Sequence, residues 1–251
     1  ELGIDLNQGT DDLLEEGVQK FVKPFSDLME SIEEKVERLE TRWQRLEYKL
    51  GEYEKAVAGA LGEMAQDDVM DRIWKHDHTV WKADPQEITN RLGWLHIARA
   101  MKENVPRMSG LVDDLRDDGY TDVLLLGMGG SSRAAETFLR TFGVQDGYLD
   151  LAVLDSTDPG AVLAQLEHLD LTKTLFVVAS KSGTTTETLS FFKFFYHRTL
   201  ELVGEEVGQH FVAITDPGSH LVDLASQHNF RGLFLNDPNI GGRYSALSFF
   251  G

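Results

Sequence analysis

From residue 120 onward the chain alternates between short apolar runs and longer amphipathic segments, and this alternation narrows the fold more than any other feature. Short runs rich in β-branched residues are typical of buried strands, and apolar residues at a helical period are typical of helices. The predicted strands cover residues 122–127, 149–154, 174–179, 209–214 and 232–235. The predicted helices cover residues 131–142, 158–168, 184–202 and 219–228. Four strand–helix–strand units predict an α/β fold with a doubly wound, five-stranded parallel sheet, whose ligands bind beyond the carboxyl ends of the strands.

The turn after the third predicted strand concentrates hydroxyl groups. It reads SKSGTTTET over residues 180–188. Hydroxyls and unpaired backbone N–H groups at a helix N-terminus favour an anion, and Gly183 would let the backbone approach that anion closely. The alternative is an ordinary capping box, with Thr184 as the N-cap and Glu187 three residues later. A capping box needs one hydroxyl, so the turn is interpreted as a phosphate site, with which a cap is compatible.

The SKSGTTTET turn resembles the phosphate loop of the sugar isomerase (SIS) domain, in the form found in the phosphoglucose isomerase family. Two further stretches resemble motifs of that family. LGMGGSS, at residues 126–132, is similar to its first glycine-rich turn, and GGRYSALS, at residues 241–248, is similar to its GGRYS signature. The three motifs occur in the family's order, and the resemblance covers about residues 75–251.

This resemblance implies roles for particular residues. Arg243 matches the family arginine beside the reacting carbons, where a cation would stabilise the oxyanion of an enediolate. Lys181 is expected to contribute chiefly its backbone N–H to the phosphate. The substrate-binding residues implied are Gly130, Ser131, Ser180, Lys181, Ser182, Gly183, Thr184 and Thr185.

The resemblance also implies what this chain lacks. The family's glutamate base, ring-opening histidine and late lysine lie in a second SIS domain and the region after it, and no glutamate here matches the base motif. We therefore expect the sugar-phosphate-binding half of a glucose-6-phosphate isomerase, converting glucose 6-phosphate and fructose 6-phosphate only together with that second domain. No cofactor and no metal are expected. The expected partners are a hexose 6-phosphate, the second SIS domain of the parent protein and, as a possibility, further copies of the chain.

Two alternative functions remain open on the sequence. One is a non-catalytic, sugar-phosphate-binding or regulatory SIS module. The other is a dinucleotide-binding domain, because Gly127-x-Gly129-x-x-Ser132 falls one glycine short of that fingerprint. Against it, a dinucleotide site uses one phosphate turn, whereas this sequence has a second, hydroxyl-rich turn two strands later.

The residues before the sheet are predicted to be mostly helical. DDLLEEGVQKF, at residues 11–21, resembles the last helix of bacterial transaldolases, so residues 1–30 are interpreted as the tail of a transaldolase fused upstream; a generic amphipathic helix is the alternative. Residues 31–118 are expected to form a helical arm and linker, and residues 119–251 the SIS domain. Apolar residues at 4-3 spacing predict one long helix over residues 30–57 with a buried seam. They are Ile32, Val36, Leu39, Trp43, Leu46, Leu50, Tyr53 and Val57.

Between the long helix and the sheet the pattern is weaker. Residues 63–84 are predicted to be irregular, and KHDH at residues 75–78 is interpreted as a surface loop because its spacing fits no metal motif. A helix is predicted from Asp84 to Asn104, ending before Pro106, followed by a short helix over residues 109–118.

Composition narrows the classes of partner. The net charge of −18 disfavours nucleic acid and gives no reason to propose an anionic membrane. A phosphorylated substrate must then meet local positive features, for which Lys181, Arg133 and Arg243 are candidates. There is no cysteine, so thiolate chemistry is excluded, and a cytoplasmic location is the default expectation.

Overall fold

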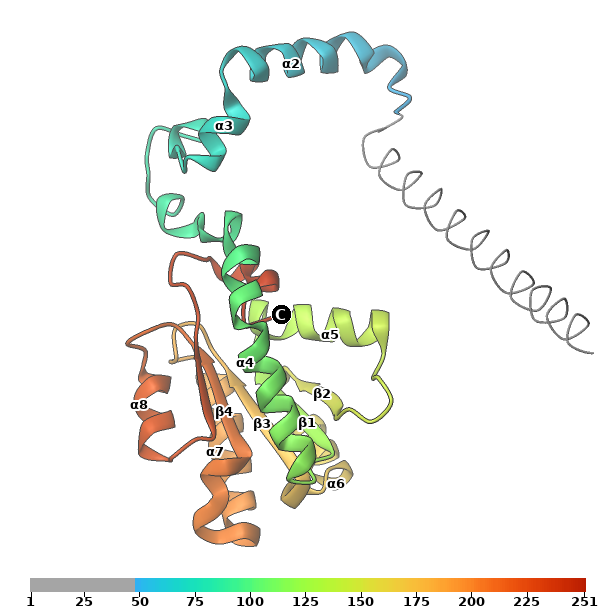
Figure 1. The fold of residues 1–251 in the computed structure, drawn as a ribbon, viewed down its shortest axis with the longest axis vertical. Helices are drawn as coiled ribbons and strands as arrows, with labels where there is room; N and C mark the ends of the chain where they lie inside the picture. The colour runs from blue at the N-terminus through green and yellow to red at the C-terminus, as the bar shows by residue number, and fades with distance from the viewer. Residues whose placement is uncertain (1–47) are drawn as a thin grey trace, which may run out of the picture. The chain divides into compact units, whose positions relative to one another are not determined.

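The structure is a computed structural model, and it describes residues 48–251 (Figure 1). The predicted transaldolase-like tail and most of the predicted heptad helix lie outside the described residues. The contacts divide the described chain between Asp67 and Asp68 into two units, which are described separately here.

The first unit contains a 3₁₀ helix, Gly51–Tyr53, and helix α2, Glu54–Gln66. The long helix predicted over residues 30–57, in which Gly51 was expected to allow a kink or an end, does not continue through Gly51. Gly51 has a φ of +56°, a left-handed conformation that an α-helix does not continue through. The seam residue Tyr53 is 64% exposed among the residues described, and no side chain of α2 is buried, so the predicted buried seam is not found over this part.

The second unit is built on a five-stranded parallel sheet. Its strands are β1 (Asp122–Gly127), β2 (Asp150–Leu154), β3 (Thr174–Ala179), β4 (Phe211–Thr215) and β5 (Gly232–Leu235). They lie side by side in the order β2-β1-β3-β4-β5, and every neighbouring pair is parallel. The predicted fold class is therefore confirmed, and each strand begins and ends within two residues of its predicted bounds.

Helices cover both faces of this sheet (Figure 1). Helices α6, α7 and α8 pack on one face, and α4 and α5 pack on the other. The bounds are α4 Ile97–Asp117, α5 Gly130–Phe142, α6 Pro159–His168, α7 Thr186–Val203 and α8 His220–Gln227. Within residues 48–251, no helix is both long enough and apolar enough to cross a membrane.

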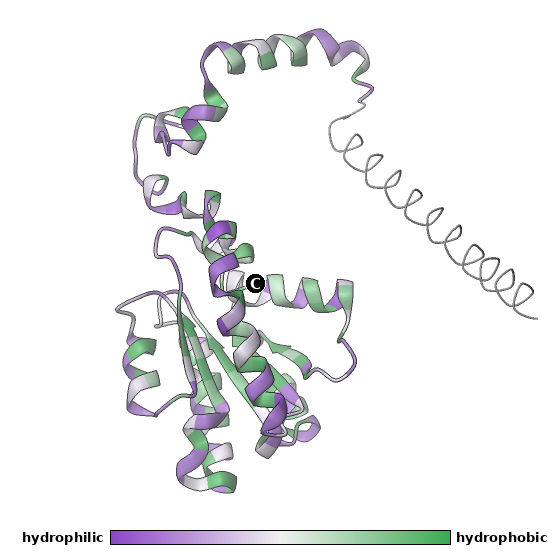
Figure 2. Cartoon of the chain, in the orientation of Figure 1, coloured by the Kyte–Doolittle hydropathy of each residue, from purple (hydrophilic) through white to green (hydrophobic). Residues whose placement is uncertain are grey.

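The strands form the most hydrophobic layer of the second unit (Figure 2). Under α7, the core is aromatic: the ring of Phe176 stacks on Phe195 with centroids 5.2 Å apart and on Phe211 at 4.9 Å. All three side chains are fully buried. Burying a large apolar side chain contributes about 1.5–3 kcal/mol, so this layer is a principal source of the stability that holds the strand ends in place.

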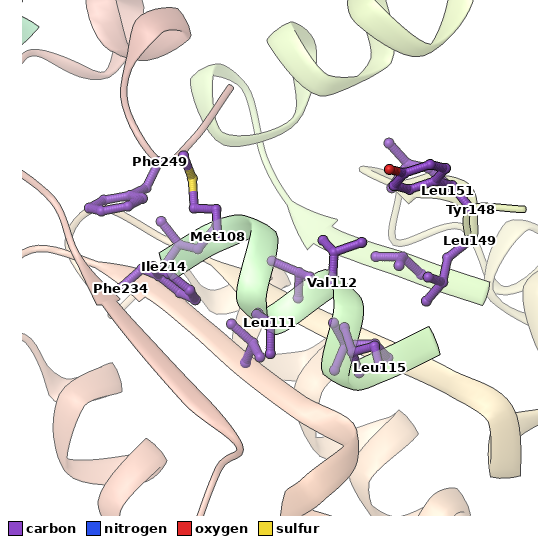
Figure 3. A pocket seen from close by; sticks show the side chains of 14 residues that line it. Met108, Leu111, Val112, Leu115, Tyr148, Leu149, Leu151, Ile214, Phe234 and Phe249 are labelled. Carbon is purple, nitrogen blue, oxygen red and sulfur yellow. The ribbon is translucent and has the colours of Figure 1, made fainter. Parts of the chain in front are cut away.

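The face covered by α4 is packed less completely. A cavity of about 350 Å³ lies beside α4, lined almost only by apolar side chains of that helix and of the strands beneath it (Figure 3). Phe234 from β5 and Phe249 from the C-terminal segment also line it, with ring centroids 5.2 Å apart.

Helix α4 runs through Pro106, so the predicted break at this residue is wrong. A proline inside a helix removes one hydrogen bond and costs about 3 kcal/mol. Met108, Leu111 and Leu115 lie beyond it and pack against the sheet. Burial of Leu115 contributes about 1.5–3 kcal/mol, and the partly buried Met108 and Leu111 add to it. Packing of this face therefore outweighs the cost of the proline.

The segment before α4 also differs from its prediction. Asp84 accepts a hydrogen bond from the Gln86 N–H at 3.0 Å, but Glu87 has a φ of +59°, which ends any helix there. Two short 3₁₀ turns follow, Thr89–Arg91 and Gly93–Leu95. They dock on the C-terminal segment, because the Gly93 N–H donates to the Asn239 carbonyl at 3.0 Å.

Residues 63–84 are more regular than predicted. Besides the end of α2, they contain helix α3, Val69–Trp74, and a 3₁₀ turn, His78–Val80. Asp77 of the KHDH stretch accepts from the Thr79 N–H at 2.9 Å and pairs with Arg72 at 2.8 Å. The Thr79 and Arg72 hydrogen bonds hold the pKa of Asp77 well below its ordinary value.

We expect Leu115→Ala to lower the free energy of unfolding by about 2–5 kcal/mol, because it opens a void between α4 and the sheet. Leu163→Ala is the matched control, since Leu115 is 2% exposed and Leu163 is 50% exposed. Urea denaturation followed by circular dichroism measures both. Equal losses in the two variants would contradict the packing described for α4.

Candidate functional site

The site begins where the order of the strands reverses. The chain passes from β1 to β2 on one side and then returns to β3 on the other side of β1. In this register Gly127 pairs with Ala179, so the two strands end side by side. The turns that follow them separate there, and in open α/β sheets this switch point is where ligands bind.

The first turn joins β1 to α5. Gly129 has a φ of +58°, which a residue with a side chain rarely adopts, and α5 begins at Gly130. At Gly127, an added Cβ would lie 2.7 Å from the Ser131 carbonyl oxygen. Ser131, predicted to bind substrate, is partly buried in the first turn of α5. The glycines thus allow a tight turn that brings the helix N-terminus up to the end of β1.

The second turn, at residues 180–185, joins β3 to α7. Ser180 is 2% exposed, and its hydroxyl lies 2.9 Å from the hydroxyl of Thr185. The Gly183 N–H donates to the Ser180 carbonyl at 3.2 Å, closing the turn. Ser182 and Thr184 are exposed, with their hydroxyls 3.1 Å apart. The hydroxyls of Ser180, Ser182, Thr184 and Thr185 therefore belong to this turn, and Thr186 is the first residue of the helix.

The N-cap of α7 is Thr185 and not Thr184, so the alternative interpretation of this turn as a Thr184–Glu187 capping box is wrong. Glu187 becomes the second helical residue instead of the third, and it cannot complete the box. No side-chain hydrogen bond caps the helix, since the Thr185 hydroxyl pairs with Ser180. The first-turn N–H groups have no partner inside the helix, so they are placed to receive an anion.

The third motif lies against the first turn. The 3₁₀ helix Gly242–Leu247 approaches α5 so closely that a Cβ on Gly130 would lie 2.2 Å from the Gly242 carbonyl oxygen. The Ser245 hydroxyl donates to the Gly242 carbonyl at 2.7 Å and lies 3.4 Å from the Gly130 carbonyl. The backbone of the GGRYS motif thus lies directly against the backbone of the β1–α5 turn.

Arg243 is exposed and lines a polar cavity of about 400 Å³. Gly130 from the first turn and Arg91 from the segment before α4 line the same cavity. Glu87 lines it too, with a carboxylate oxygen 3.5 Å from the Arg91 guanidinium. Sequence reasoning missed Arg91 and Glu87, because their contact with GGRYS depends on how residues 89–95 dock.

Lys181 differs from the other residues of its turn. Its ammonium pairs with the Asp216 carboxylate and donates to the Pro238 carbonyl at 3.2 Å. Burial raises the pKa of Asp216, and the hydrogen bond from Lys181 opposes that rise. Sequence reasoning also missed Asp216, although TDPGS directly after an apolar strand at the same sheet edge was the available signal.

A doubly wound parallel sheet with a glycine-rich and a hydroxyl-rich turn at its switch point, and a third motif against the first of them, defines an SIS-type α/β domain. The family model described as phosphoglucose isomerase matches residues 83–251. This chain belongs to the phosphoglucose isomerase family.

Relatives and solved structures agree with this assignment. Glucose-6-phosphate isomerase of Campylobacter jejuni is 33% identical over 137 residues, covering 53% of this chain and 33% of the relative. That of Acaryochloris marina is 28% identical over 215 residues, covering 85% of this chain and 39% of the relative. The crystal structure of a glucose-6-phosphate isomerase from Chlamydia trachomatis aligns with a TM-score of 0.55 and 28% identity, covering 73% of this chain and 33% of that one. The chain therefore spans about a third of the length of these relatives.

We expect Gly130→Ala to disrupt the junction between α5 and GGRYS, because the new methyl group overlaps the Gly242 carbonyl. The matched control is Gly110→Ala in α4, where an added Cβ meets nothing within 4 Å. That control should raise stability by about 0.4–1 kcal/mol, since alanine restricts the unfolded chain. Thermal denaturation of both variants measures the difference, and a Gly130→Ala protein as stable as the control would contradict this backbone contact.

Proposed function

We propose that this chain is the sugar-phosphate-binding part of a glucose-6-phosphate isomerase. The observation that carries the proposal is the pairing of β1 with β3, which sets the turn at residues 127–130 beside the hydroxyl-rich turn at residues 180–185. A hexose 6-phosphate would place its phosphate on the second turn. Its carbon chain would extend toward Ser131 and Arg243.

The phosphate is recognised mainly by neutral donors. Ser180, Ser182, Thr184 and Thr185 supply hydroxyls, and the start of α7 supplies backbone N–H groups and the positive end of a helix dipole. Hydrogen bonds to a charged group contribute about 1.5–3 kcal/mol each, so a few of them suffice for millimolar to micromolar binding. Gly130 and Gly183 let the two turns pack closely against the Gly242 carbonyl and the Ser219 hydroxyl, which fixes the backbone that would receive the ligand.

Arg243 supplies the electrostatic part of the chemistry. Moving a proton between C1 and C2 of the open-chain sugar passes through an enediolate, which carries negative charge on oxygen. A guanidinium at that oxygen stabilises the transition state, and a single donor of this kind contributes about 10²–10³ in rate. The exposed Arg243 in a polar cavity is suited to this task.

The proton transfer needs a base, which we assign to a part of the parent protein outside this chain. Glu187 lies in the first turn of α7, and Glu87 lines the Arg243 cavity. Neither matches the base motif of the family. The transaldolase-like tail at residues 1–30 lies outside both the family match and the described residues, and a fusion stays a prediction.

We expect Ser180→Ala combined with Thr185→Ala to weaken binding of glucose 6-phosphate and of inorganic phosphate by at least about tenfold, because hydrogen bonds to a charged group are lost. Thr137→Ala, which removes a hydroxyl bonded only to the backbone of α5, is the control and should bind as before. Isothermal titration calorimetry measures both. Unchanged affinity in the double variant would reject the phosphate assignment.

We expect this chain alone to exchange the C2 proton of glucose 6-phosphate at least about 10²-fold more slowly than an isomerase with both SIS domains, because a positioned base contributes about 10²–10⁴ in rate. Proton NMR in deuterated buffer follows the exchange. An equal rate would mean that the base lies within this chain. Glu87→Gln and Glu187→Gln would then identify which carboxylate serves.

A further inference from the structure

The turn at residues 180–185 rests on the loop that follows β4. The Asp216 N–H donates to the Lys181 carbonyl at 3.2 Å, and the Thr215 hydroxyl lies 3.4 Å from the same oxygen. Behind it, Gly183 packs so tightly that an added Cβ would lie 2.7 Å from the Ser219 hydroxyl. The shape of the turn therefore depends on residues 215–219, none of which is among the predicted substrate-binding residues.

Side-chain interactions of Lys181 link three strand ends at the same edge of the sheet, and we call this set of contacts the Lys181 tie. Lys181 lies just beyond β3, Asp216 just beyond β4 and Pro238 three residues beyond β5. The Lys181 ammonium pairs with the Asp216 carboxylate and donates to the Pro238 carbonyl at 3.2 Å. Both side chains are mostly buried, with 27% of Lys181 and 15% of Asp216 exposed. Three strand ends are therefore joined through one ammonium group.

In this ion pair, the charge of the Asp216 carboxylate depends on the presence of Lys181. The second carboxylate oxygen of Asp216, Oδ1, is buried and has no hydrogen-bond partner among the described residues. Burial raises the pKa of this carboxyl, and Lys181 is the main group that keeps it charged. An ammonium engaged in this way is not a free cation for a phosphate, because its charge is already matched by a buried carboxylate.

We propose that Asp216 is a positioning residue for the phosphate turn, holding Lys181 so that residues 180–185 stay fixed to the segment that leads to Arg243. This inference rests on the proposed function, whose ligand it shares. On this inference, the phosphate binds backbone N–H and hydroxyl groups. The Lys181 side chain does not bind it and instead holds the turn in place.

The two roles for Lys181 predict opposite signs for one substitution. If the ammonium bound the phosphate directly, Asp216→Asn would free it and remove a neighbouring negative charge, so phosphate affinity would rise. If Asp216 positions the turn, the same substitution weakens the tie, and affinity falls. Lys181→Met lowers affinity in both cases, so it cannot separate them alone.

The experiment is a double-mutant cycle on the full chain, with Asp216→Asn, Lys181→Met and both together. Binding of inorganic phosphate and glucose 6-phosphate is measured by calorimetry well below the melting temperature of each variant. We expect each single change to weaken binding by about three- to tenfold, and the double change to weaken it no further, because contacting residues in one tie are not additive. Asp118→Asn is the matched control, since it breaks the ion pair with Arg231 just before β5, at the opposite edge of the sheet. It should leave affinity unchanged.

A second readout needs no ligand. Amide hydrogen exchange at residues 181–184 should accelerate in Asp216→Asn and stay as in the unmodified chain in Asp118→Asn. Higher affinity in Asp216→Asn, or unchanged affinity with unchanged exchange, would overturn the positioning role while leaving phosphate binding intact. An unmodified chain that binds neither phosphate nor glucose 6-phosphate would overturn the proposed function and this inference with it.

Discussion

The parallel pairing of β1 with β3 is the contact on which the rest of the site depends. It places Gly127 beside Ala179, so two turns of different chemistry leave the sheet at one point. A shift of this register by one residue would exchange the faces to which the side chains of one strand point, and it would move one turn away from the other. The aromatic layer under α7 holds the register, because Phe176 of β3 is clamped between Phe195 and Phe211. Packing under α7 thus sets the geometry of the two turns that are proposed to bind the ligand.

The candidate site carries little positive charge. The whole chain carries a net charge of −18, yet the turn that would hold a phosphate has one cation, and that cation is engaged by Asp216. Fixed N–H dipoles and hydroxyls act at hydrogen-bond range, whereas the distant carboxylates are screened over about 8–10 Å at physiological salt. An acidic protein can therefore bind an anion without a basic patch. Arg243 remains exposed, as its proposed contact with the sugar requires.

The sequence was sufficient to predict the strands of the sheet, but it was insufficient to predict the helix ends and side-chain contacts around it. Strands were predictable because buried parallel strands are unbroken apolar runs, and the motif turns followed from their place after those runs. The helix break predicted at Pro106 was wrong because the cost of a proline is local, whereas the packing of α4 on the sheet involves residues distant in the chain. The alternative cap at Thr184 was wrong because spacing does not reveal that the Thr185 hydroxyl pairs with Ser180. Asp216 was overlooked for the same kind of reason: its partner is 35 residues away in the chain.

The contact of Gly130 with the GGRYS turn also bears on the order in which the protein assembles. The Ser245 hydroxyl reaches the Gly130 carbonyl across 115 residues of sequence, so this junction closes one of the longest loops in the domain. Contacts of such separation carry a larger closure entropy than local ones, so we expect this junction to form late in folding. A chain that has built the sheet but not this junction would hold the hydroxyl-rich turn without the Arg243 cavity. A ligand that contacts both the hydroxyl-rich turn and Arg243 would then bind only the fully folded protein. By mass action, such a ligand would raise the free energy of unfolding.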